Sequence, residues 1–559
     1  MSLNNRCWVA LAAAGVVVLF QFASALTPFG GDDVYVLANL NSANWMQRLF
    51  AFNLDAPAPE YMPWWTGVVT QRRFIRVPAC LLLWLQSVVF GRNAVAYHLF
   101  TLAIISFTCC LITFAASRWL SWPAAILTAL IPAVHPTTAE IVGTVNCQPL
   151  ATSGLLSVLA VIAWTTMRLR RSTMFGVTTV GLCALAVMSY EAAIALPLVL
   201  VSADVVLWRP PATWWERWGP RAGVLAMSVL NAACSIWMRR DLVTPDTSAP
   251  RLLSEIWLSL RLDGVAYFFK AIGLLNPLEP FTYWVHHLVG EPIAVAFAAV
   301  LIVGICFAIG KDRVGWLGLA AFFLFLAPPL LTRAAVSRFN LPTLRQIYLP
   351  LLLGAPLVAV AFARRDLGRL ASITAWAWLA LLAVEANVSG RFREVVTKRL
   401  AEERSVIAAL KDVPAGSTIV GVGEDTCGFA GSFVWAGPAL LAIPKDLDGN
   451  APELVAVDPQ TFLARAKRGL DMQTQASIAR RPPGPTRGPA WVDRVPPLAV
   501  TQGWQRIVGA TVSVEERSPA VVTSLRYRFD RPLSELAFLR YRGCSQVERL
   551  WLSFQLTPP

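Results

Sequence analysis

The chain has 559 residues, of which 56% are hydrophobic and 15% are charged, and its mean hydropathy is +0.54. An ordinary soluble domain carries about 25% charged residues, so this composition excludes a single large soluble globule and predicts several membrane-spanning helices. The formal net charge of +14 raises the question of nucleic-acid binding, which the distribution of the basic residues along the chain decides.

Charge divides the chain near residue 390. Residues 1–390 contain 26 basic and 17 acidic residues, about 11% charged, whereas residues 391–559 contain 22 and 17, about 23%. The first part therefore has the composition of a helical bundle in lipid, and the second has that of a water-soluble domain. We predict a transmembrane domain over residues 1–390 and a soluble domain over residues 391–559.

Eleven apolar runs in the first part are long enough to cross a bilayer, which takes about 17–25 residues. They predict an α-helical polytopic membrane protein with about eleven transmembrane helices. Two further apolar segments, 77–91 and 256–275, carry flanking Arg and Pro and are expected at the interface or packed on the bundle. The predicted spans are residues 8–26, 95–117, 121–138, 143–166, 173–189, 191–208, 222–238, 292–310, 314–331, 346–363 and 370–388.

The loops between these spans predict the orientation. If the N-terminus is cytoplasmic, the loops on its side hold 13 basic and three acidic residues, which is the asymmetry that the positive-inside rule requires. The odd number of spans then places residues 391–559 in the periplasm of a bacterium, and the protein in the inner membrane. The positive charge thus indicates topology, and no nucleic-acid partner is expected. The first span has an alternative, because Ala23-Ser24-Ala25 resembles the cleavage site of a signal peptide.

Four acidic residues are predicted at the outer ends of different spans. Asp32 and Asp33 lie in the first outer loop, residues 27–76, while Glu140 follows the third span and Glu191 lies between the fifth and sixth. Carboxylates that gather at one face can bind a divalent metal ion, share a proton or act as a general base. Each also has a structural alternative, because Asp after glycine favours a turn and Glu favours a helix start.

Arginines supply the opposite charge on the same predicted face. Arg76 closes the first outer loop, and Arg345 precedes the tenth span. The planar guanidinium binds phosphate through paired hydrogen bonds and stays charged, although contact with lipid headgroups is an alternative. Carboxylates and arginines on one face predict a reaction with a phosphate leaving group near the membrane surface.

Six short motifs lie in order along residues 1–365. They are Asp32-Asp33, Phe74-Ile75-Arg76, Phe90-Gly91-Arg92 with Tyr97-His98, His135-Pro136 with Glu140, Ser189-Tyr190-Glu191 with Pro197 and Asp204, and Arg345-Gln346-Ile347-Tyr348-Leu349-Pro350. This series resembles the C-type integral-membrane glycosyltransferases. The branch that it is most similar to is the protein O-mannosyltransferase-like proteins, including the bacterial relatives of the transmembrane and tetratricopeptide-repeat-containing proteins.

Such enzymes transfer a sugar from a polyprenyl-phosphate carrier to an acceptor on the outer or lumenal face of a membrane, usually with inversion. The resemblance implies that Asp32 or Asp33 is the general base and that Arg345 contacts the carrier phosphate. It assigns no cofactor, and a divalent metal ion stays open. The implied partners are the lipid-linked donor, membrane lipids and an unknown acceptor. The other residues that the resemblance assigns to substrate binding are His135, Glu140, Glu191, Arg76 and Tyr348.

The chain departs from this branch at two motifs. Tyr190 stands where the branch often has Lys, and residues 144–148 read Thr-Val-Asn-Cys-Gln where it often has Gly-Arg. No tetratricopeptide array follows. Donor sugar and acceptor therefore stay open, and so do two other functions: a transporter or flippase for lipid-linked or anionic cargo, and an inactive relative that serves as a binding subunit. A transporter is expected to carry charges near mid-span or an internal repeat.

The predicted soluble domain is expected to be α+β or β-rich. Residues 391–411 have the charge pattern of a helix, whereas residues 417–422 and 521–529 are apolar and β-branched like strands. Cys427 and Cys544 are the only cysteines in this part. Because the periplasm is oxidising, a disulfide between them is a hypothesis.

Overall fold

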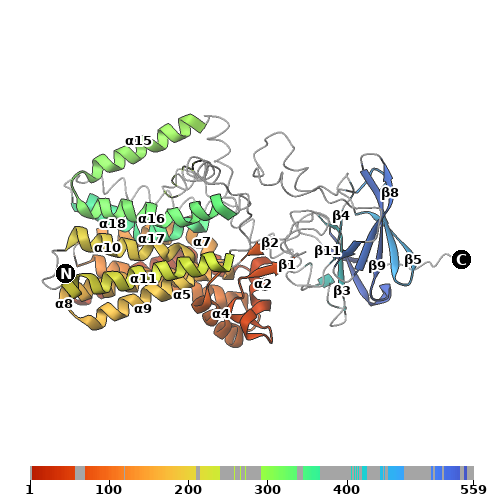
Figure 1. Ribbon diagram of the computed structural model, residues 1–559, viewed down its shortest axis with the longest axis horizontal. Helices are drawn as coiled ribbons and strands as arrows, with labels where there is room; N and C mark the ends of the chain where they lie inside the picture. Colours follow the sequence, from red (N-terminus) through yellow and green to blue (C-terminus); the bar gives the residue numbers. More distant parts are fainter. Residues whose placement is uncertain are drawn as a thin grey trace. The chain divides into compact units, whose positions relative to one another are not determined.

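The computed structural model is mainly helical up to residue 364 and is built of strands after residue 418 (Figure 1). It describes residues 3–239 with gaps at 30, 57–69, 73, 119 and 209–213, then 291–336 and 344–364, and thereafter mainly 418–424, 441–444, 451–470, 505–507, 510–518, 521–541 and 547–550, with a few single residues elsewhere. The chain forms two compact units. The first comprises Met1–Thr27, Asn39–Phe52 and Arg73–Phe392, and the second comprises Pro28–Ala38, Asn53–Arg72 and Arg393–Pro559.

The first unit is helical. Two of its helices begin at a capping side chain: Asn93 accepts a hydrogen bond from the backbone N–H of Ala96 before α5, and Asp312 accepts from Val314 at 2.7 Å before α16. Its elements are α1 (Leu3–Gln21), η1 (Phe22–Leu26), α3 (Trp45–Leu49), α4 (Val77–Phe90), α5 (Ala94–Ala116), α6 (Trp122–Val134), α7 (Pro136–Val142), η3 (Val145–Cys147), α8 (Gln148–Arg170), α9 (Thr173–Ser189), η4 (Glu191–Ala195), α10 (Leu196–Leu207), α11 (Trp214–Arg239), α15 (Glu291–Ile309), α16 (Arg313–Val336), η7 (Leu344–Ile347), α17 (Tyr348–Leu353) and α18 (Ala355–Arg364).

Helices cover ten of the eleven predicted spans, and the eleventh, residues 370–388, lies outside the described residues. Among the described residues, five helices are long and apolar enough to cross a membrane, or six if the bent pair α6–α7 forms one span. The count of eleven stays a prediction, because α9 has only 17 residues and α10 has 12. The five are Leu3–Leu26, Ala94–Ala116, Val145–Arg170, Trp218–Met238 and Arg313–Leu330.

The third predicted span is broken between α6 and α7, which meet at an angle of 59°. Pro136 causes the break, because its ring cannot donate a backbone hydrogen bond and disfavours helix in the residue before it. The carbonyl oxygen of Ala133, left without a helical partner, accepts from the Gln21 amide at 2.8 Å. The Nδ1 atom of His135 accepts from the backbone N–H of Thr137 at 3.1 Å and so caps α7. Backbone groups on both sides of the break are therefore hydrogen-bonded, and the break sets the direction of α7.

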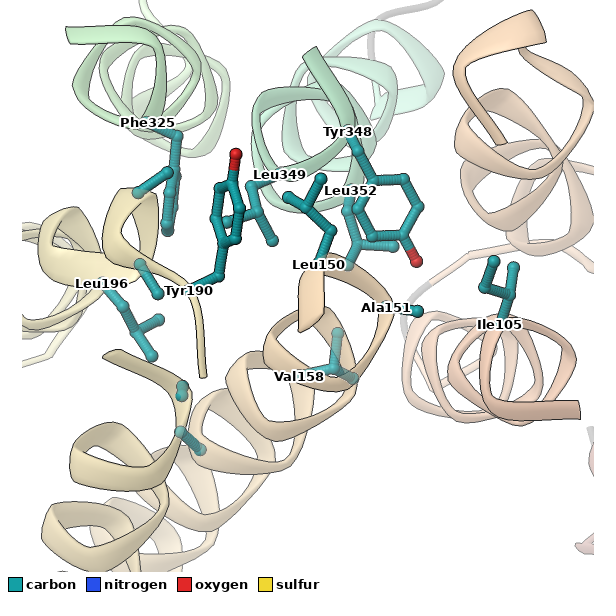
Figure 2. Close-up of a cluster of buried hydrophobic side chains, with 14 of the residues drawn as sticks. Ile105, Leu150, Ala151, Val158, Tyr190, Leu196, Phe325, Tyr348, Leu349 and Leu352 are labelled. Atoms are coloured by element: carbon teal, nitrogen blue, oxygen red, sulfur yellow. The ribbon is translucent and has the colours of Figure 1, made fainter. Parts of the chain in front are cut away.

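Close packing fixes α17, which directly follows η7, against α8. A Cβ atom at Gly154 would lie 2.9 Å from the Tyr348 ring and 2.8 Å from Leu352, so only glycine lets these elements approach so closely. Figure 2 shows this part of the core, where Tyr348, Leu349 and Leu352 lie among side chains of the surrounding helices. The surrounding residues are Ile105, Leu150, Ala151, Val158, Tyr190, Leu196 and Phe325.

The second unit is built of strands around one aromatic core. Phe462 stacks on Tyr527 and Phe529 at ring-centroid distances of 5.1 and 5.5 Å, and meets Phe538 of the other sheet edge-on at 5.6 Å. The strand region therefore agrees with the expected β-rich domain. Five strands lie in the order β5-β6-β9-β8-β7, all antiparallel, and four lie in the order β11-β10-β3-β4, with β3 parallel to both neighbours.

The elements of the second unit have the following bounds. They are α2 (Gly31–Leu40, which belongs to this unit up to Ala38), β1 (Leu54–Ala56), β2 (Thr70–Arg72), β3 (Thr418–Glu424), β4 (Leu441–Pro444), β5 (Glu453–Asp458), β6 (Thr461–Arg465), β7 (Gln505–Ile507), β8 (Ala510–Ser518), β9 (Val521–Phe529), η9 (Leu533–Glu535), β10 (Leu536–Tyr541) and β11 (Val547–Leu550).

Candidate functional site

Arg76 and Glu191 form a close ion pair. Arg76 immediately precedes α4, and Glu191 opens η4 after the extended residue Tyr190. The Arg76 Nη2 atom donates to Glu191 Oε2 at 3.0 Å, and its Nε atom lies 3.3 Å from both carboxylate oxygens. The side chains are only 10% and 22% exposed. Two groups that sequence analysis assigned to substrate binding are thus paired with each other.

Aromatic rings enclose the Arg76 guanidinium. Its central carbon lies 4.2 Å from the ring centroid of Phe74, 4.7 Å from that of Tyr190 and 5.1 Å from that of Phe52. Each ring face attracts the cation. The rings and the carboxylate together hold Arg76 in one position, which identifies it as a fixed part of the site.

Glu140 and Arg345 form a second, looser pair. Glu140 Oε2 accepts from the backbone N–H of Arg345 at 3.1 Å, whereas the charged atoms closest to each other, Arg345 Nε and Glu140 Oε1, are 4.0 Å apart. The Nη1 atom of Arg345 lies 3.3 Å from Cys147 Sγ. Cys147 and then Glu140 hold the pKa of Arg345 above its usual range, so the side chain stays a cation.

The two pairs are joined through Tyr190. Its hydroxyl donates to Gln346 Oε1 at 3.0 Å, and each of these residues adjoins a charged one, Glu191 and Arg345. Burial raises the pKa of Tyr190, so its hydroxyl keeps its proton. We call the four charged residues the double ion-pair cluster; they come from segments far apart in the sequence. The cluster consists of Arg76, Glu140, Glu191 and Arg345.

Two other predicted binding residues have packing roles near this cluster. His135 is fully buried, and because its Nδ1 atom accepts a hydrogen bond to cap α7, its other nitrogen carries the proton of the neutral ring. Tyr348 is also fully buried, and its hydroxyl has no hydrogen-bond partner among the described residues. His135 thus supports α7, which carries Glu140, and Tyr348 packs at the start of α17, directly after the turn η7 that carries Arg345. Their assignment to substrate binding stays a prediction.

The predicted catalytic acids belong to the second unit. Both lie at the start of α2, where the Asp33 side chain is fully buried and the Asp32 side chain lies outside the described residues. Their role as general base stays a prediction. Cys427 and Cys544 also lie outside the described residues, so the disulfide between them stays a hypothesis. Where the structure is described, no group of three or more His, Cys, Asp and Glu could hold a metal ion.

A second ionic cluster, around Asp204, was missed by sequence analysis. Asp204 Oδ2 accepts from Arg221 Nε at 2.7 Å and also from Arg168, and all three side chains are at most 10% exposed. The rings of Trp164 and Trp218 cover the two guanidiniums. The charge count above assigned both arginines to loops, whereas the structure buries them. One signal could have predicted this: Asp204 lies inside the apolar run 191–208, and an acid at that depth needs a partner.

Comparison with known proteins gives only distant similarities. No protein-family profile matches the chain, and no curated protein matches it. Among solved structures, it is similar to the Archaeoglobus fulgidus oligosaccharyltransferase in complex with zinc and sulfate, with 14% identity and a TM-score of 0.34 over 78% of this chain and 62% of that one. The same enzyme tethered with an acceptor peptide matches over 80% and 65%, again with 14% identity and a TM-score of 0.34.

A second similar protein is ArnT from Cupriavidus metallidurans bound to undecaprenyl phosphate, with 14% identity and a TM-score of 0.34 over 78% of this chain and 85% of that one. The chain spans less than two thirds of the length of the oligosaccharyltransferase. A TM-score of 0.34 is too low to carry a conclusion about the activity of this chain, so its function has to follow from the chemistry of its own residues.

Proposed function

We propose that the chain transfers a sugar, with inversion, from a polyprenyl-phosphate carrier to an acceptor on the outer face of a bacterial inner membrane. The observation that carries the proposal is the double ion-pair cluster, in which two arginines and two glutamates gather beside the ends of apolar helices. Arginine suits the phosphate of a lipid carrier, and carboxylates suit the proton transfer that accompanies attack by a hydroxyl group.

The proposed reaction is a single displacement at the anomeric carbon. The acceptor oxygen forms a bond to that carbon while the bond to the carrier phosphate breaks, and the electron pair of the broken bond stays on the phosphate oxygen. The acceptor proton passes to a carboxylate. A cation beside the phosphate stabilises the negative charge that grows there in the transition state. Arg345 is the proposed cation, because its pair with Glu140 is long, whereas Arg76 is engaged by Glu191 and three rings.

The proposed base is Asp32 or Asp33, as the resemblance to the C-type glycosyltransferases implies. The choice between them stays open, and the proposal needs only that one of them accepts the acceptor proton. A divalent metal ion is likewise left open, since no described group of side chains suggests where one would bind.

The proposed membrane location is supported by apolar side chains that the protein itself leaves uncovered. Helix α15 exposes Phe297, Val300, Val303 and Phe307, which would be costly in water and is favourable against lipid tails. The same lipid-facing surroundings would hold the tail of the carrier, so that binding in the membrane positions the phosphate for reaction.

Transfer assays on the full-length protein in liposomes test the proposal. Labelled polyprenyl-phosphate sugars are supplied to the wild type and to the variants Asp32→Asn, Asp33→Asn and Arg345→Gln, with Asp312→Asn as a control that removes a carboxylate far along the chain. We expect one Asp variant to lose at least about a hundredfold in rate, as removal of a general base does. Unchanged transfer in both Asp variants would exclude the assigned base, and unchanged transfer in Arg345→Gln would exclude the phosphate contact.

The same liposomes separate the two alternative functions. A flippase would move labelled lipid between the leaflets without forming a glycosylated product, and an inactive relative would bind the lipid without either effect. The wild-type protein is enough to distinguish the transferase, the flippase and the inactive binding subunit. Transfer that depends on an acceptor supports the proposal, and its absence with intact lipid binding refutes it.

A further inference from the structure

The two ion pairs of the cluster differ in what holds them. In the Arg76–Glu191 pair, the guanidinium donates directly to the carboxylate at 3.0 Å. In the other pair, Glu140 is anchored mainly by the backbone N–H of Arg345 at 3.1 Å, and the charged groups approach only to 4.0 Å. The Glu140 carboxylate thus lies beside the Arg345 guanidinium at a distance longer than a hydrogen bond.

The looser pair is also the more accessible one. The Arg345 and Glu140 side chains are 23% and 32% exposed, against 10% and 22% for Arg76 and Glu191. A partly exposed pair at this separation is attractive but weak, and such pairs shift an equilibrium by about fivefold or less. An anion with better geometry, such as a phosphate, can therefore replace the Glu140 carboxylate beside Arg345.

We propose that the Glu140 carboxylate is a stand-in anion for Arg345. It neutralises the Arg345 guanidinium when no carrier is bound, and it promotes release of the sugar-free carrier phosphate after sugar transfer. This inference rests on the proposed function, because it requires that Arg345 binds the carrier phosphate. The Glu140 carboxylate is then the partner of Arg345 in the empty site, and the phosphate is its partner when the carrier is bound. Glu140 is then a positioning residue that acts through Arg345, and it takes no part in forming or breaking the glycosidic bond.

The change in charge of the carrier phosphate during the reaction explains why a carboxylate beside Arg345 would be useful. The donor is a phosphodiester with one negative charge, and the electron pair left by the departing sugar turns it into a phosphate monoester with about −1.5 to −2 charges at pH 7. The product is therefore attracted to Arg345 more strongly than the donor, which favours product inhibition. A carboxylate held by the same residue repels the product more than the donor, because repulsion grows with the charge of the phosphate.

Glu140→Gln tests this role with little structural change. The glutamine carbonyl oxygen can still accept the hydrogen bond from the Arg345 backbone, so only the charge is removed. Asp312→Asn is the matched control: it removes one carboxylate charge from the cap of α16, where asparagine caps equally well. Unchanged thermal unfolding of both variants establishes that they fold.

Two readouts are measured on the full-length protein. The first is the dissociation constant of a short-chain polyprenyl phosphate, which we expect to fall about three- to fivefold in Glu140→Gln and to stay constant in Asp312→Asn. The second is steady-state transfer, in which both kcat and KM should fall in Glu140→Gln, because the product then leaves slowly. A residue with a merely structural role would not tighten binding.

The outcomes separate this inference from the proposed function. Unchanged or weaker binding in Glu140→Gln, while Arg345→Gln loses binding, overturns the stand-in role and leaves the phosphate contact intact. Unchanged binding in Arg345→Gln overturns the phosphate contact itself, and the stand-in role with it. Tighter binding and slower turnover in Glu140→Gln, absent from the control, support the inference.

Discussion

Replacing Arg76 by lysine would keep a positive charge beside Glu191 but remove the planar fork that donates to both carboxylate oxygens. It would also remove the flat surface that the rings of Phe52, Phe74 and Tyr190 cover. A lysine ammonium reaches only one oxygen at a time and carries a larger hydration shell. We therefore expect Arg76→Lys to destabilise the helical unit although the charge is conserved.

The magnitude follows from the lost contacts. A hydrogen bond to a charged group contributes about 1.5–3 kcal/mol, and a cation–π contact contributes about 0.5–1 kcal/mol where water has access. Lysine would retain part of both, so we expect a loss of about 2 kcal/mol. Since 1 kcal/mol corresponds to roughly 2–4 °C in domains of moderate size and to less in longer chains, the melting temperature should fall by about 2–4 °C.

Thermal unfolding of the detergent-solubilised protein at a fixed scan rate measures this change, with the 22 Trp residues as the fluorescent probe. Arg345→Lys is the control from within the same cluster, and its looser pair predicts less than half the effect. In a double-mutant cycle, Glu191→Gln and Arg76→Lys should together cost less than the sum of the single changes. Additive shifts, or equal losses in Arg76→Lys and Arg345→Lys, would refute the assigned difference between the two pairs.

Three further changes should alter stability, each measured by the same unfolding assay. Gly318→Ala should lower the free energy of unfolding by about 1–3 kcal/mol, because its Cβ would lie 2.8 Å from the Gly354 carbonyl oxygen. The control Gly304→Ala has open space around the new Cβ and should be neutral or stabilising. Equal effects of the two changes would contradict this expectation. Asp204→Asn should cost about 3–5 kcal/mol, since two buried arginines lose their anion, and a neutral outcome would show that water reaches them. Gln21→Leu should cost about 1–3 kcal/mol by leaving a carbonyl at the α6–α7 break unpaired, and no loss would mean that another group pairs it.

Composition and hydropathy were enough to predict the apolar helices that the structure describes up to residue 364 and the strands over residues 417–422 and 521–529, because both signals are local. A run of apolar residues has to leave water whatever its neighbours are, and an alternating pattern suits a sheet with one buried face. Helix breaks were harder to predict. Residues 121–138 were assigned to one span, but Pro136 divides them into two helices at 59°. The proline was visible in the sequence, whereas the partner that accommodates the break, Gln21, lies more than a hundred residues away.

The candidate site shows the same limit. The chemistry of its residues was evident from their types, since acids and arginines next to apolar runs are conspicuous. Their pairing was not, because a salt bridge between residues 76 and 191, or between 140 and 345, depends on how helices pack and not on spacing along the chain. For the same reason Arg168 and Arg221 were counted as loop cations, although packing brings both onto Asp204.

The sequence by itself determined which segments avoid water, where charge is scarce, and which residues can do acid, base or phosphate chemistry. Those properties belong to single residues and short windows. Only the tertiary structure decided that the Arg76 guanidinium is hydrogen-bonded to a carboxylate and enclosed by three rings, while the Arg345 guanidinium lies 4.0 Å from its carboxylate. The strength of an ion pair depends on distance, geometry and exclusion of water, and folding alone fixes these three quantities.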